Sequence, residues 1–238
     1  MHVSIVSDYI KRYNLNMKKP SGKVGFSKEY WDINYATPQE MDNIVNAREH
    51  SLYIQALFNL EYLEIESVID LGFGLGFLFA EVLKTFNPYR AYGIEPSIFP
   101  YEEVLARGIA PNDSTKLVLD NIDLVTWSQK KDSKIEKIFD LGLCTSVFQY
   151  LKDDEIKMVL PVMARRIRYL YFSVPTDIEL QRQIDEVEFK DEYAIHRTKE
   201  KYFKLISPYF TFISSRMLES KVHFDESTTH FTDLLFRF

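Results

Sequence analysis

The sequence predicts an α/β fold in which a mostly parallel sheet carries helices on both faces and ends in an antiparallel pair of strands. Three observations indicate this fold. From about residue 60, short apolar runs alternate with helical segments, a pattern typical of parallel sheets. A glycine-rich turn joins the first of these strands to the next helix. Near the end of the sequence, two β-like runs follow each other with no room for a crossover helix between them.

The composition describes one large domain, or a domain with an appendage. The chain has 238 residues, of which 46% are hydrophobic, and a formal net charge of −6. This charge disfavours non-specific binding to nucleic acid. No run approaches the roughly 18 apolar residues of a membrane helix, and the first residues lack a basic flank followed by an apolar stretch. The single cysteine, Cys144, excludes an intramolecular disulfide, so we expect a cytoplasmic protein without nucleic-acid or membrane partners.

The N-terminal part differs from the rest. Residues 1–36 are rich in aromatic residues and lysines and show little periodicity, so we interpret them as an arm or lid. The segment Thr37-Pro38-Gln39-Glu40 has the form of a helix start, because the threonine hydroxyl can accept from an amide three residues on and proline needs no donor. We expect that helix to run to about Phe58. Residues 1–60 would then form a helical lid on a domain of residues 61–238.

The later elements follow from apolar runs and from their boundary residues. Asn87-Pro88 and Gly108 are typical of helix ends, and Asp153-Asp154 can cap a helix. The predicted strands are 67–71, 91–95, 117–119, 139–145 and 169–174, and the predicted helices are 77–86, 98–107 and 153–166. The β-like runs of the tail are 209–218 and 228–238.

The most informative segment is the turn after the first strand. Gly72, Gly74 and Gly76 let the backbone turn tightly and let a ligand approach closely. A dinucleotide fingerprint would place a glycine three residues after the second one, where this chain has Phe77. Asp70 precedes the turn and would repel a pyrophosphate but attract an ammonium group. The turn therefore favours a zwitterionic or cationic ligand over a diphosphate.

Two further acids follow the next strands. Glu95 ends the second strand, at the distance from the turn where an acid binds ribose hydroxyls in nucleotide-binding folds. Asp120 follows the third strand, where a carboxylate can accept from an adenine amine or can simply cap a turn. Ammonium, ribose and adenine each meet a candidate partner at successive strand ends.

These segments, together with Phe139-Asp140-Leu141-Gly142-Leu143-Cys144-Thr145, resemble the successive motifs of class I S-adenosylmethionine-dependent methyltransferases over roughly residues 60 to 238. The resemblance implies a Rossmann-like sheet of seven strands with an antiparallel C-terminal strand, and S-adenosyl-L-methionine as cofactor. It implies that Gly72, Gly74 and Gly76 line the methionine part of the cofactor and that Glu95 binds its ribose. It places Asp120 and Asn121 at the adenine, and an insert at about 176–200 over the substrate.

The catalytic candidates are less specific. Many small-molecule methyltransferases of this class carry a histidine where this chain has Tyr150, so Tyr150 is one candidate for accepting a proton. His196, in the predicted insert, is the other, although a lone histidine is more often a surface residue. Cys144 is more simply a packed strand residue than a nucleophile. Tyr30, Trp31 and Tyr35 are candidates for closing over the cofactor and the substrate, or for anchoring the arm.

We therefore expect S-adenosylmethionine-dependent methyl transfer, most simply to a small molecule, with no metal ion. The alternatives are a protein methyltransferase and a regulatory module that binds the cofactor without turnover. A nicotinamide oxidoreductase is a further alternative, which Phe77 and Asp70 disfavour.

Overall fold

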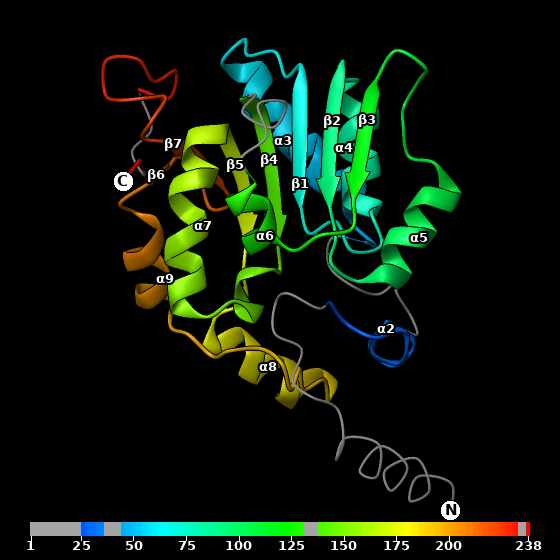
Figure 1. Cartoon of the computed structure of the whole chain (residues 1–238). Coiled ribbons are helices and arrows are strands. Elements are labelled where there is room, and N and C mark those ends of the chain that lie inside the picture. The colour runs from blue at the N-terminus through cyan, green and yellow to red at the C-terminus, as the bar shows by residue number, and fades with distance from the viewer. Residues whose placement is uncertain (1–24, 36–43, 131–137, 233–236) are drawn as a thin grey trace, which may run out of the picture.

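The computed structural model describes residues 25–35, 44–130, 138–232 and 237–238. Its centre is a seven-stranded sheet in the order β3-β2-β1-β4-β5-β7-β6, with helices on both faces (Figure 1). Strands β1 to β5 are parallel, and β7 runs antiparallel to its neighbours β5 and β6. The predicted fold class is confirmed. The strands are β1 Ser67–Leu71, β2 Arg90–Ile94, β3 Lys116–Asp120, β4 Phe139–Thr145, β5 Ile167–Ser173, β6 Phe210–Phe212 and β7 Met217–Ser220.

Two layers of helices bury the two faces of the sheet. Apolar residues of α3, α4 and α5 pack against one face, and those of α6, α7 and α9 pack against the other. The helices are α2 Lys28–Asn34, α3 Ala47–Leu60, α4 Phe77–Phe86, α5 Ile98–Arg107, α6 Leu124–Gln129, α7 Asp153–Arg166, α8 Asp177–Val187 and α9 Lys199–Ile206. In the described part of the chain, no helix has both the length and the apolar character needed to cross a membrane.

The central strands are buried for most of their length because they have helices on both faces. Every residue of β1 is buried, and β4 contributes Leu141, Leu143 and Cys144 to the core. The cysteine thus packs inside a strand, and burial raises the pKa of its thiol well above the ordinary value. A thiolate nucleophile is disfavoured there.

The structure corrects the predicted first helix. Residues 44–46 form a turn and α3 begins at Ala47, so a continuous helix from Thr37 to Phe58 is wrong. The proposed start at 37–40 lies outside the described residues. A shorter helix, α2, occupies part of the predicted arm: the Ser27 side chain accepts from the amide of Tyr30, and Tyr30 and Trp31 are buried. The division into a lid of residues 1–60 and a domain of residues 61–238 stays a prediction.

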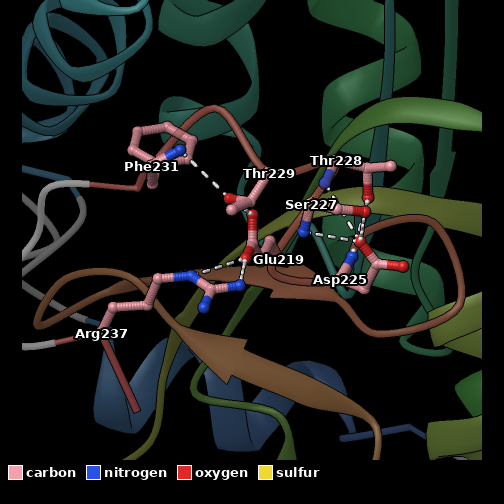
Figure 2. Close-up of polar contacts among 7 residues, drawn as sticks. All are labelled: Glu219, Asp225, Ser227, Thr228, Thr229, Phe231 and Arg237. Carbon is pink, nitrogen blue, oxygen red and sulfur yellow. Dashed lines mark hydrogen bonds and ion pairs between the residues drawn. The ribbon is translucent and has the colours of Figure 1, made fainter.

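The strands of the tail are also corrected. The antiparallel pair consists of β6 and β7, joined at Ser214, whose Oγ accepts from the Met217 amide at 3.0 Å. Both strands therefore come from the run that was predicted as one strand. The described part of the second run, 228–232 and 237–238, contains no strand. Its side chains instead reach back to the sheet, where Thr229 and Arg237 contact Glu219 of β7 (Figure 2).

Candidate active site

A cavity of about 760 Å³ lies at the carboxyl ends of the parallel strands, in the size range of small-molecule sites. The glycine turn after β1 and the ends of β2, β4 and β5 form its floor. Residues of α2 and α8 line it from outside the sheet, and in Figure 1 both helices lie beyond the arrowheads of the strands. Open α/β sheets place their ligands at this edge.

The glycine turn needs its glycines for conformation and for space. Gly72 has φ +116°, and a Cβ built there would lie 2.6 Å from a methyl carbon of Val147. Gly76, the N-cap of α4, has φ +70°, and a Cβ there would lie 2.7 Å from Val104. Side chains rarely adopt either geometry. The turn therefore presents bare backbone to the cavity.

Asp70 lines this cavity from the end of β1. Its side chain is only 4% exposed, and no hydrogen bond or ion pair to its carboxylate is found in the described part of the chain. Burial, with a further contribution from Glu95, raises the pKa of Asp70 well above its ordinary value. A buried carboxylate without a partner is costly on its own. The position therefore fits a ligand that supplies a positive charge or hydrogen-bond donors.

Glu95, also predicted as a ligand residue, follows β2 and faces the same cavity. Its two carboxylate oxygens accept from the amides of Gly74, at 3.0 Å, and Ser97, at 2.8 Å. Burial raises its pKa, although these hydrogen bonds act in the opposite direction. The Ser97 side chain also acts on it as a hydrogen-bond partner, and a carboxylate has about four lone-pair positions, so capacity for a further donor remains. Glu95 thus fixes the glycine turn and can still bind a diol.

Asp120 and Asn121 are not among the residues that line the cavity. Asp120 accepts from Tyr92, at 2.6 Å, and from Lys130, at 3.0 Å. Burial acts to raise its pKa, but these two contacts leave it below the ordinary value. Asn121 donates to the backbone carbonyl of Glu95 at 2.7 Å. The structure gives no support for direct contact of either residue with an adenine, and it gives Asn121 a role in holding the Glu95 loop.

Solved structures similar to this chain are methyltransferases. The plantazolicin methyltransferase BpumL, in complex with SAH, has TM-score 0.57 and 15% identity over 86% of this chain and 78% of that chain. The N-methyltransferase NodS from Bradyrhizobium japonicum WM9, with S-adenosyl-L-homocysteine (SAH), has TM-score 0.56 and 13% identity over 81% of this chain and 97% of that chain. The chain has the class I methyltransferase fold.

Another structure with this fold, magnesium protoporphyrin IX methyltransferase (ChlM) from Synechocystis PCC 6803 with bound SAH, has TM-score 0.53 and 14% identity over 81% of this chain and 96% of that chain. The small RNA methyltransferase HEN1 has TM-score 0.53 and 16% identity, and the match covers 76% of this chain but only 26% of HEN1. No protein-family model and no curated protein sequence matches the chain.

In this chain, α2 covers the glycine turn with aromatic side chains. A ring carbon of Trp31 lies 3.4 Å from the Cβ position of Gly74, and the rings of Trp31 and Tyr35 are 4.4 Å apart. Both line the cavity. Tyr30 does not line it, but packs against Phe26 with ring centroids 4.1 Å apart. The Phe26 amide donates to Ser97 Oγ at 2.9 Å and so ties α2 to the loop after β2.

Tyr150 lines the cavity opposite the glycine turn, at the end of the 3₁₀ turn Phe148–Tyr150. Its hydroxyl donates to Asp191 Oδ2 at 2.6 Å, and the Tyr30 hydroxyl lies 3.4 Å away. Burial, together with Tyr30 and Asp191, raises the pKa of Tyr150 well above its ordinary value. Tyr150 is therefore held as a protonated phenol, and the geometry disfavours it as an independent base.

His196 is exposed and is not among the residues that line the cavity. It borders a separate surface depression formed by α8, beside Asp177 and Asp185. The structure therefore does not bring His196 together with the glycine turn, and gives no support for its predicted catalytic role. No cluster of His, Cys, Asp and Glu in the described ranges has the composition of a metal site.

Sequence reasoning missed two residues that organise the Tyr150 side. Asp191 carries no motif, and only the fold brings it to Tyr150. Arg197 stands near Lys199 and Lys201 in the sequence, a grouping typical of a solvated basic surface, but its guanidinium is buried. It donates to the carbonyls of Phe148, at 3.2 Å, and Leu151, at 2.5 Å, and pairs with Asp153 at 2.8 Å. Arg197 thereby fixes the turn that presents Tyr150.

Proposed function

We propose that this protein transfers a methyl group from S-adenosyl-L-methionine to a small-molecule acceptor. The observation that carries the proposal is the pair of buried carboxylates, Asp70 and Glu95, on either side of a bare glycine turn. Asp70 has no hydrogen-bond partner among the described residues, and Glu95 has spare acceptor capacity. An ammonium group and a ribose diol are the complementary donors. The SAH complexes of BpumL, NodS and ChlM, which share the fold, support the same cofactor.

Each residue then has a separate task. Asp70 binds the ammonium group of the cofactor, and Glu95 binds its ribose hydroxyls. The backbone of Gly72, Gly74 and Gly76 lies along the methionine part. Asn121 acts indirectly, by holding the loop that carries Glu95.

The cofactor supplies an activated methyl group on a positively charged sulfur, so the protein's main work is to align the acceptor and exclude water. Trp31 of α2 lies over the glycine turn with Tyr35, the C-cap of that helix, packed against it, and Gln183 of α8 lines the cavity with them. Coverage by two helices encloses a compact acceptor more readily than a polymer chain. This coverage is the feature that favours a small molecule.

Equilibrium binding tests the proposal. Isothermal titration calorimetry of the full chain should show binding of S-adenosylmethionine and SAH. Glu95→Gln should raise both dissociation constants about 10- to 100-fold, the range expected for losing hydrogen bonds to a charged group. Glu102→Gln changes an exposed carboxylate on α5 in the same way and should leave both constants unchanged.

Two results would reject the proposal. One is no measurable binding of either nucleoside to the wild-type chain. The other is an equal affinity of both variants, because it would mean that Glu95 does not contact the cofactor. If binding occurs, methyl transfer to a panel of metabolites, followed by mass spectrometry, separates an enzyme from a module that only binds.

A further inference from the structure

We propose that the acceptor is an amine. The aromatic and acidic side of the cavity recognises either its cationic form or the positive charge that its nitrogen acquires during methyl transfer. This inference rests on the proposed function and names the substrate class for the same site. The geometry behind it is a set of aromatic rings backed by one carboxylate, on the side of the cavity that faces the glycine turn.

The rings come from two separate parts of the chain. Phe26, Trp31 and Tyr35 approach from α2 and its preceding residues, and Tyr150 approaches from the turn after β4; all four line the cavity. Phe26 and Tyr150 meet edge to face with centroids 4.8 Å apart. Aromatic faces attract cations, and cages of such rings are a recurrent way to bind alkylammonium groups.

A carboxylate lies directly behind these rings. Asp191 accepts the Tyr150 hydroxyl proton at 2.6 Å through Oδ2, and the Tyr193 amide at 3.0 Å through Oδ1. Its negative charge also acts on Tyr30 and Tyr35, where it contributes to the raised pKa of both hydroxyls. The nearby Arg197 does not cancel this charge, because it pairs with Asp153. The aromatic side of the cavity therefore carries a negative charge.

The orientation of Tyr150 suits an amine in particular. Because its proton points to Asp191 and the Tyr30 hydroxyl occupies one lone pair at 3.4 Å, the other lone pair of its oxygen remains for an N–H donor from the cavity. In the transfer, the nitrogen lone pair forms the bond to the methyl carbon while the S–C bonding pair stays on sulfur. Positive charge then develops on nitrogen, and the rings and Asp191 stabilise it. Groups that stabilise charge developing in the transition state increase the rate.

An anionic acceptor is the competing class, because two arginines also line the cavity. Arg182 is well exposed and lies 3.7 Å from Glu186, and Arg216 already has an interaction partner within the chain. The aromatic side offers the Asp191 carboxylate instead, which accepts two hydrogen bonds and has no ion pair within the described ranges. The two classes predict opposite charge preferences, so three probes of one shape separate them.

The experiment measures binding of choline, 3,3-dimethylbutanol and 3,3-dimethylbutanoate to the full chain saturated with SAH. The three probes share a bulky branched head and are a cation, a neutral alcohol and an anion. We expect choline to bind about tenfold more tightly than the alcohol, and the anion to bind most weakly. Asp191→Asn, which keeps the shape of the side chain, should reduce the preference for choline over the alcohol to the part that the aromatic rings supply, without changing the SAH constant.

A control and a second variant keep the test decisive. Asp185→Asn removes a charge from the outer side of α8, where Asp185 accepts from Gln181, and should preserve the choline preference. If Asp191→Asn fails to fold, Trp31→Leu should reduce choline binding more than alcohol binding. Equal affinity of the wild-type chain for choline and alcohol, or a preference for the anion, overturns the inference alone. Absence of SAH binding rejects the proposed function, and the inference with it.

Discussion

Glu219 and Asp70 are both buried carboxylates of one sheet, but their surroundings are opposite. Glu219 on β7 is 0% exposed, and both of its oxygens are bonded: Oε2 accepts from Thr229 at 2.7 Å, and Oε1 accepts from Arg237 at 2.7 and 3.1 Å (Figure 2). Asp70 on β1 is equally enclosed, and the described residues provide it with no partner. Burying a charge is tolerable when other groups compensate it. The compensation is built into the chain at Glu219 and is left to a ligand at Asp70.

Glu95 is intermediate between these two cases. It accepts one backbone amide at each oxygen, with a further contribution from the Ser97 side chain, which is enough to hold it in place and leaves room for a further donor. The number of internal hydrogen-bond partners therefore rises from Asp70 through Glu95, which both line the cavity, to Glu219, which does not. This order distinguishes residues that stabilise the fold from residues that bind.

The largest expected effect is on stability, at Glu219. Arg237→Met keeps the aliphatic stem but leaves a buried carboxylate without its cation, and should lower the free energy of unfolding by about 3 to 5 kcal/mol. The matched control is Arg168→Met, because Arg168 is half exposed and lies 3.5 Å from Asp140. That change should cost less than about 1 kcal/mol. Denaturation in urea measures the free energy of unfolding of both variants. Similar losses of stability in the two variants would contradict the contrast between Glu219 and an exposed ion pair.

Replacing Asp70 should change the free energy of unfolding in the opposite direction. Asp70→Asn removes a buried charge for which the described residues provide no partner, so at neutral pH it should raise the free energy of unfolding by about 1 to 2 kcal/mol. The same variant should bind SAH more weakly. A variant that is more stable without ligand and weaker in binding is the signature of a residue reserved for a ligand.

The pH dependence sharpens this prediction. Because the pKa of Asp70 is raised in the folded state, the folded protein holds this proton at pH values where the unfolded chain has lost it. The free energy of unfolding must then fall as the pH rises from the ordinary carboxyl range to the raised pKa. Asp70→Asn should lack this decrease, so the two proteins should be equally stable in acid and diverge as the pH rises. If the free energies of unfolding of the two proteins changed in parallel with pH, the Asp70 carboxylate would be compensated in the folded protein.

The sequence was sufficient where signals are local. The helices 77–86, 98–107 and 153–166 and the strands 67–71 and 139–145 were predicted with the bounds that the structure has. Each has an apolar run of the right period and a distinct boundary residue, such as Gly76 or Gly108. The positions of Asp70 and Glu95 in the cavity were also predictable, because the carboxyl ends of parallel strands meet at one edge.

Prediction from sequence was insufficient where distant residues meet. Asp120 occupies the predicted strand end, but Tyr92 and Lys130 take up its carboxylate, and nothing in the local sequence indicates them. The short helix α2 is positioned by contacts such as that of Trp31 with the glycine turn, which its own periodicity does not indicate. Asp191 reaches Tyr150 across 41 positions of sequence. Tertiary contacts of this kind decide which polar residues remain available to a ligand.

The smallest expected effect concerns Asn121, which touches the site only through backbone. Its side-chain amide donates to the carbonyls of Glu95, at 2.7 Å, and Pro96, at 3.1 Å. Asn121→Ala removes both hydrogen bonds and loosens the loop, which should raise the SAH dissociation constant about fivefold, equivalent to about 1 kcal/mol. Asn59→Ala, at an exposed position of α3, is the control. A loss as large as that of Glu95→Gln would instead mean that Asn121 contacts the nucleoside directly, as the resemblance implied, and that the loop rearranges on binding.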